Sequence, residues 1–332
     1  MKQFVFILVV LAGSFGHFSA FAQEPIVIKF SHVVSSDAPK GRAAEYFKKL
    51  AEKATQGKVR VEVYHNSVLY KDREELEALQ LGAVQMLAPA LAKFGPLGIK
   101  EFEVFDLPYL FPDKQALRRV KQGYVGKMLL KKLHAKGLTG LAYWDNGFKL
   151  MSANKPLRMP ADFKGLRMRI QDSRVLDAQM RALGAIPEAM VFSDVYDALQ
   201  KGIIDGTENP PSNLYTQKMH QVQKHVTLSN HGYLGYAVIV NTKFWNGLPA
   251  DIRDKLEDAM QEATLYADKV AEEENAKALE AVRRSGKTIV HALTPAEEAA
   301  WRASLLPVHE LMEARIGKET ISAVKREVRR LQ

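Results

Sequence analysis

Arginine is placed where it could bind an anion in residues 166–170, in which Leu, Met and Ile alternate with two arginines. A period of two predicts a strand that directs Arg167 and Arg169 to one face. The flanking pattern indicates an α/β protein with sheets covered on both faces, where a buried guanidinium needs a partner. Two interpretations are open from this pattern: an ion pair with Asp or Glu elsewhere in the chain, or a site for a ligand carboxylate.

Further anion-binding groups lie near the ends of other expected strands. Lys149 follows the turn-like residues 145–147, and Asn209 and Asn213 flank a double proline. Ligands of open α/β sheets bind beyond the carboxyl ends of the strands. A bidentate arginine, a lysine and an amide suit a small carboxylate, and two cations suit a dicarboxylate.

Motifs of catalysis and of cofactor binding are missing. The sequence has no phosphate-binding loop, no dinucleotide fingerprint, no serine nucleophile elbow and no zinc-protease motif, so we expect no cofactor and no metal. Asp205 and Glu208 could serve as acid and base, but the glycine between them suits a turn equally well. His32 and His231 lie at strand ends and could meet in a cleft, although a lone histidine is more often structural.

The N-terminus has the pattern of a secretory signal peptide. Lys2 precedes an apolar run at residues 4–12, and residues 20–22 form an A-x-A-like cleavage site. Residues 1–22 are therefore expected to be removed, leaving an exported, periplasmic chain of about 310 of the 332 residues. No other stretch is long and apolar enough to span a bilayer.

Composition excludes several classes of protein. Cysteine is absent, which rules out disulfides, thiolate metal sites and a cysteine nucleophile. The formal net charge is +9, but basic residues are dispersed among acidic ones, so nucleic acid is not an expected partner. A mild positive field would steer small anions instead.

Strand and helix patterns alternate in the first part of the chain, which predicts parallel βαβ units. A long irregular segment is expected at residues 94–113, and one very long helix is expected at 249–285. The other elements expected in the first half are strands at 26–30, 59–64, 84–88 and 138–144, helices at 39–55, 72–81 and 115–133, and a sharp turn at 145–147.

Three longer motifs then identify a resemblance. Residues 164–169 (KGLRMR), 192–200 (FSDVYDALQ) and 205–210 (DGTENP) resemble the DctP-type solute-binding proteins of TRAP transporters, and the likeness covers essentially the whole mature chain. Residues 146–149 and 231–236 resemble the branch that binds C4-dicarboxylates: succinate, fumarate and malate.

The resemblance implies a two-lobed periplasmic binding protein fold of the α/β class, with a long helix spanning both lobes and the ligand between them. It implies that residues 23–146 with 235–274 form the first lobe and that 147–234 with 275–332 form the second. It also implies a TRAP permease with a small and a large membrane subunit as partner, and a monomer that performs no chemical step.

The resemblance also assigns site residues. Arg169 matches the arginine that pairs with the ligand carboxylate, and Asn209 matches an asparagine that binds the same carboxylate. Lys149 is expected to hold the distal carboxylate, and Phe192 to line the pocket. Arg167 has no matched role and is expected to be structural or exposed. Further positions near the matched pocket are Ser31, His32, Asp72, Lys93, Ser173, Asn213 and Tyr233.

Three departures from the branch could change which diacid fits. Ala90 stands where relatives usually have serine, and His65 and Val68 replace a more usual proline and glutamine. Alternatives therefore stay open: another small carboxylate such as a 2-oxo acid, a sugar acid or an aromatic acid, a sensory protein that presents its ligand to a receptor, or a periplasmic enzyme.

Overall fold

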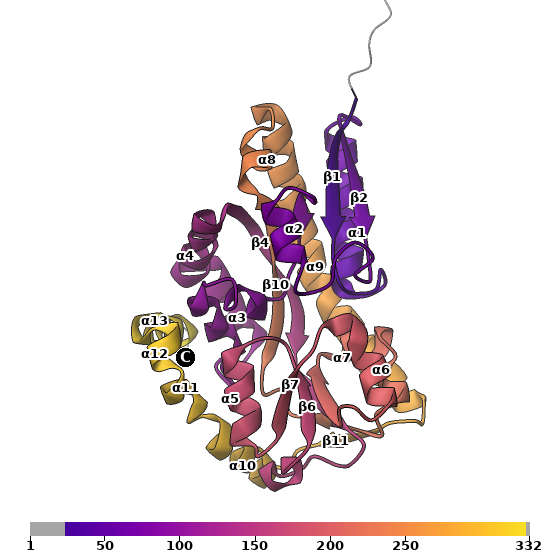
Figure 1. Cartoon of the computed structure of the whole chain (residues 1–332), viewed down its shortest axis with the longest axis vertical. Coiled ribbons are helices and arrows are strands. Elements are labelled where there is room, and N and C mark those ends of the chain that lie inside the picture. Colours follow the sequence, from indigo (N-terminus) through magenta and orange to yellow (C-terminus); the bar gives the residue numbers. More distant parts are fainter. Residues whose placement is uncertain (1–23, 330–332) are drawn as a thin grey trace, which may run out of the picture.

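The computed structural model describes residues 24–329, so the expected signal peptide lies outside the described residues. Two β-sheets organise this part of the chain, and we call the parts built on them the first and second lobes (Figure 1). The first sheet has the order β2-β1-β3-β10-β4. Its strands are β1 Ile26–Ser31, β2 Val59–Tyr64, β3 Met86–Leu87, β4 Leu138–Phe148 and β10 Tyr233–Asn241.

The second sheet has the order β11-β9-β5-β8-β6-β7, and β6 pairs in parallel with both of its neighbours. Helices cover both sheets, which confirms the α/β class and explains why the strands are rich in buried apolar residues. The strands of this sheet are β5 Leu150–Ala153, β6 Arg167–Ile170, β7 Ile186–Ala189, β8 Gly206–Asn209, β9 His225–Leu228 and β11 Ile289–Ala292.

Amphipathic patterns account for most of the helices. The face of α1 that carries Ala43, Phe47 and Ala51 is fully buried against the first sheet, as the spacing predicts. The α-helices are α1 Pro39–Ala54, α2 Glu75–Gln80, α3 Lys114–Gln122, α4 Tyr124–Lys132, α5 Arg174–Ala182, α6 Val195–Gln200, α7 Pro211–Thr216, α8 Thr242–Asn246, α9 Ala250–Arg284, α10 Pro295–Leu305, α11 Val308–Leu311, α12 Glu313–Ile316 and α13 Lys318–Arg329.

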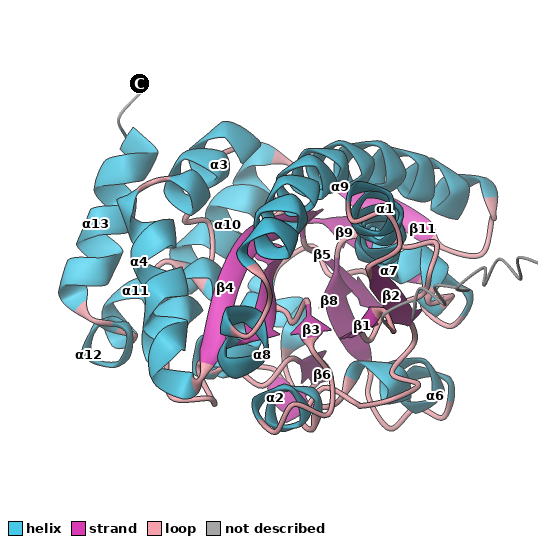
Figure 2. Cartoon of the chain, turned by 90° about the horizontal axis from the view of Figure 1, so that it is seen from above, coloured by secondary structure: helices cyan, strands magenta, loops and turns pink. Residues whose placement is uncertain are grey.

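The chain passes between the lobes at two adjacent strand connections and along one helix. β4 continues into β5, β9 continues into β10, and the Lys149 amide donates to Gly232 O at 2.8 Å where these connections lie side by side. Helix α9 packs on α1 and β4 of the first lobe and on α7 of the second, and Figure 2 shows it running across the molecule. The long helix predicted at 249–285 is therefore confirmed.

Two local predictions were wrong. The helix expected at 115–133 is divided at Gly123, because α4 begins close to the end of α3 and a side chain on Gly126 would collide with the Lys121 carbonyl. The turn expected at 145–147 is part of the continuous strand β4. There Leu234 pairs with Gly147 and Gly235 with Asp145, so Asn146 is the extra residue of a β-bulge.

The C-terminal helices contact both lobes. Trp301 and Leu305 of α10 belong to the core of the second lobe. Ile321 and Val324 of α13 pack instead in a core shared with α3, α4 and the first sheet. The division expected from the sequence placed all of 275–332 in the second lobe, whereas α13 lies against elements of the first (Figure 1).

No helix in residues 24–329 combines the length and the apolar character that crossing a bilayer requires.

Candidate functional site

Arg169 is a buried cation in strand β6. Met168 and Ile170 point into the core of the second lobe, so the alternation directs Arg169 to the other face. Its Nε and Nη2 donate to the carbonyl oxygen of Met190 at 3.0 and 2.8 Å, and its guanidinium lies 5.6 Å from the ring centroid of Phe192. Within residues 24–329 no carboxylate lies within 4.0 Å of this guanidinium. Burial lowers the pKa of Arg169 against the opposing influence of nearby carboxylates.

Arg167 forms an ion pair with an acidic residue of the protein, which was one of the two roles that the sequence left open for the arginines of this strand. Its Nη2 lies 2.8 Å from Asp205 Oδ1, and Asp205 Oδ2 also accepts from the Arg167 amide. The Arg167 side chain is 41% exposed. The strand therefore carries one half-exposed structural arginine and one buried arginine whose charge has no carboxylate partner among the described residues.

Arg169 faces a small cavity between the lobes. The cavity measures about 20 Å³, which is room for a single water molecule. Its lining comes from both lobes, as expected of a ligand site that opens and closes by a hinge. The polar lining residues are Lys40, Asp72, Lys93, Arg169, Gln171, Asn209, Asn213 and Tyr236, and the apolar ones are Val33, Val34, Ala90, Phe192 and Leu234.

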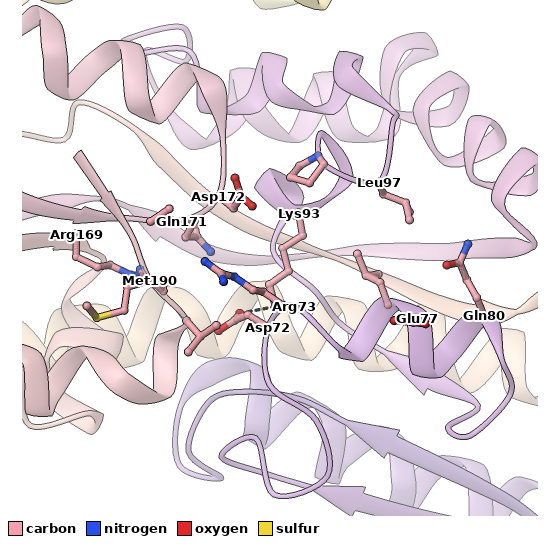
Figure 3. Close-up of a pocket in the computed structure, with 14 residues that line it drawn as sticks. Asp72, Arg73, Glu77, Gln80, Lys93, Leu97, Arg169, Gln171, Asp172 and Met190 are labelled. Carbon is pink, nitrogen blue, oxygen red and sulfur yellow. Dashed lines mark hydrogen bonds and ion pairs between the residues drawn. The ribbon is translucent and has the colours of Figure 1, made fainter. Parts of the chain in front are cut away.

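A larger cavity of about 250 Å³ adjoins the small one and shares four of its lining residues. Figure 3 shows the ion pair between Lys93 and Asp72 near the centre of this larger cavity, with Arg169 and Gln171 to one side. Because the larger cavity is partly lined by exposed groups, it provides a route from solvent to Arg169.

Lys93 lines both cavities, and its ammonium already contacts two carboxylates. Its Nζ lies 2.5 Å from Asp72 Oδ1 and also contacts Glu75. Burial alone would raise the pKa of Asp72, but Lys93, the Phe192 amide and Arg169 outweigh burial and lower it to about 2. Asp72 Oδ2 accepts the Phe192 N–H at 2.5 Å, so this ion pair also links the two lobes.

Lys149 lies outside both cavities. Its buried Nζ is 2.6 Å from Glu208 Oε1, and Glu208 Oε2 accepts from His231 Nε2 at 2.8 Å and from Gln179 Nε2 at 3.1 Å. Burial alone would raise the pKa of Glu208, but Lys149 and His231 lower it to about 2. The ammonium expected to hold a distal carboxylate therefore already pairs with a protein carboxylate.

Sequence reasoning missed Lys40. This residue, in the first turn of α1, is 2% exposed, donates from Nζ to Ala88 O at 2.9 Å and lies 3.9 Å from the ring centroid of Tyr236. Burial and Lys93 lower its pKa to about 7, against Glu75 and Asp72. A lysine at a helix N-terminus opposes the helix dipole, and this was the sequence signal that could have found it.

The remaining predicted residues divide into two groups. Asn209, Asn213 and Phe192 line the small cavity with Arg169, Asp72 and Lys93. The others lie outside both cavities. Ser173 Oγ caps α5 and donates to Asp106, and the Tyr233 hydroxyl donates to Asp145. Ser31 is buried, and His32 contacts His65. His32 and His231 do not meet, because each bonds within its own lobe.

Comparison with known proteins places the chain in a family. Residues 30–315 match the family described as bacterial extracellular solute-binding protein, family 7, DctP. The C4-dicarboxylate-binding periplasmic protein DctP of Rhodobacter capsulatus is 68% identical over 302 residues, which cover 91% of each chain.

Solved structures of similar proteins share the fold. A TRAP periplasmic solute-binding protein from Shewanella oneidensis with bound succinate has a TM-score of 0.90 and 43% identity, covering 92% of this chain and all of that one. Another from Pseudomonas aeruginosa with bound L-malate has a TM-score of 0.84 and 46% identity, covering 86% of this chain and all of that one. The chain therefore belongs to the DctP family of TRAP transporter solute-binding proteins, as the motifs in its sequence predicted.

Proposed function

We propose that the protein captures a C4-dicarboxylate such as succinate, fumarate or malate in the periplasm and delivers it to a TRAP permease with a small and a large membrane subunit. The observation that carries this proposal is the buried guanidinium of Arg169, which faces the cavity between the lobes with no carboxylate partner in residues 24–329. A ligand carboxylate supplies the missing charge, and the amide of Asn209 lines the same cavity.

Capture requires the lobes to separate, because a cavity of about 20 Å³ does not admit a four-carbon diacid. The Phe192 ring and the Asn209 amide belong to the second lobe, whereas Asp72 and Lys93 belong to the first, so closure brings the two groups around the ligand. Neither capture nor closure changes the ligand chemically, so the protein acts as a binding module and not as an enzyme.

A thermal-shift screen tests the ligand class. Succinate, fumarate and malate bind only the folded chain and are expected to stabilise it by about 2.7 kcal/mol at about 100 times Kd. For a chain of this size the melting temperature then rises by about 5 °C. Butyrate, which has the same length and one carboxylate, serves as the matched control. If butyrate, a sugar acid or a 2-oxo acid raises the melting temperature and the diacids do not, the ligand is another carboxylate. If the diacids are converted to new products in the mixture, the protein is an enzyme.

The periplasmic location rests on the first 22 residues, which lie outside the described part of the chain. N-terminal sequencing of the exported protein is expected to begin at Gln23, after the A-x-A-like site. A mature chain that retains Lys2 would contradict this processing.

A further inference from the structure

Two buried cations line the small cavity without a carboxylate partner. One is Arg169 in the second lobe, and the other is Lys40 in the first. Lys93, the third cation, contacts both Asp72 and Glu75. In the described part of the chain, the lining thus has two cations that make no direct contact with a carboxylate, one on each lobe.

Lys40 is held in a position that is costly for a lysine. An ammonium has three N–H donors, and the described residues supply one acceptor, the Ala88 carbonyl oxygen. The Tyr236 ring provides a further, weaker attraction. Burying a charge without a counter-ion opposes folding, so packing of apolar residues elsewhere must offset it.

The backbone around Lys40 fixes the direction of this side chain. Pro39 begins α1, and Gly41 lies so close to the preceding loop that a Cβ there would collide with the carbonyl oxygens of Ser35 and Ser36. The buried face of α1 packs on the first sheet. Lys40 therefore has a rigid base from which its ammonium reaches the cavity.

We propose that Lys40 is the second carboxylate anchor, so that a dicarboxylate binds between Arg169 of one lobe and Lys40 of the other. The inference rests on the proposed function and deepens it, because it names the group that distinguishes a diacid from a monoacid. Lys149, the cation that the sequence suggested for this task, has Glu208 as its partner and is a positioning group of the second lobe.

The second anchor has a consequence for pH. The groups facing Lys40 are Asp72, Glu75, Lys93, His32 and the Tyr236 ring. Burial, opposed by Glu75 and Asp72 and reinforced by Lys93, leaves the pKa of Lys40 at about 7 before ligand binds. A bound carboxylate raises that pKa, because it favours the charged ammonium. The contribution of Lys40 to diacid affinity is therefore complete below about pH 7, where the ligand carboxylates are still ionised, and it falls as the pH rises above this value. Binding at pH 8 takes up protons.

The test compares Lys40→Met with Lys49→Met, an exposed position on the same helix. Succinate and butyrate binding are measured by calorimetry or ligand-observed NMR. Lys40→Met is expected to weaken succinate binding about thirtyfold, to leave butyrate within about twofold, and to abolish the proton uptake at pH 8. Lys49→Met is expected to change none of these. Lys40→Arg, which keeps the charge, is expected to recover part of the succinate affinity.

A structural role for Lys40 predicts a different pattern. In that case Lys40→Met lowers the melting temperature of the ligand-free protein, whereas removal of an unmatched charge is expected to maintain or raise it. Wild-type succinate affinity in a folded Lys40→Met protein overturns the inference and leaves the proposed function intact. A wild-type protein that binds no C4-dicarboxylate overturns both.

Discussion

Arg169→Ala is expected to remove dicarboxylate binding almost completely while the protein stays folded. Truncation of one member of a buried, hydrogen-bonded charge pair costs about 2–5 kcal/mol, so Kd should rise by about thirty- to several-thousandfold. The loss falls on the complex, because in the described chain Arg169 bonds only to the Met190 carbonyl and has no carboxylate partner to leave unpaired. Calorimetric titration with succinate measures the change, and circular dichroism checks the fold.

Arg167→Ala on the same strand provides the matched control. Its guanidinium pairs with Asp205 at a half-exposed position and belongs to neither cavity. Exposed ion pairs contribute about 0–1 kcal/mol, so this variant should bind succinate like the wild type. Equal succinate affinities in the two variants would return Arg169 to a structural role.

Glu208→Ala is expected to destabilise the second lobe strongly. It leaves the buried Lys149 ammonium without a counter-ion and removes the acceptor of His231. Breaking a buried pair in this way costs about 3–5 kcal/mol, which corresponds to a fall in melting temperature of about 5–10 °C or more. Asp205→Ala, which breaks the half-exposed pair three residues earlier, should cost about 1 kcal/mol or less.

The Glu208 carboxylate also contributes to the stability of the folded protein at acidic pH. Its pKa in the folded protein is about 2, below the ordinary value of 4.5, because Lys149 and His231 favour the charged form. A lowered pKa stabilises the fold fully above about pH 4.5, and this contribution is lost as the pH falls toward 2. Glu208→Gln should therefore show a weaker pH dependence of unfolding in this range, and an unchanged acid profile would contradict the pairing.

The sequence was most informative where a pattern is local. Alternation at residues 166–170 predicts the strand and the buried side of Arg169, and the spacing of apolar residues predicts α9. Both depend on neighbours in the chain, which are visible in the sequence. The family motifs then extend these local patterns to the whole fold.

The sequence did not show which acidic side chain pairs with which lysine. Whether Lys149 or Lys40 is available to a ligand depends on which acids lie opposite. Met151 pairs with Glu208 across β5 and β8, and this register brings Glu208 within reach of Lys149. Such a pairing joins residues nearly sixty positions apart and depends on sheet order. Similarly, the bulge at Asn146 is a property of the β4–β10 pair, so residues 145–147 have the composition of a turn without forming one.

The return of α13 to the first lobe constrains the order in which the protein can fold during its production. The core that begins with Leu76 and Leu79 is completed by Ile321 and Val324, close to the end of the described chain. A nascent chain emerges from the ribosome from its N-terminus, so the first lobe lacks these contacts until residues 321–324 have been synthesised. A polypeptide that completes this core late keeps its apolar side chains exposed for longer during synthesis.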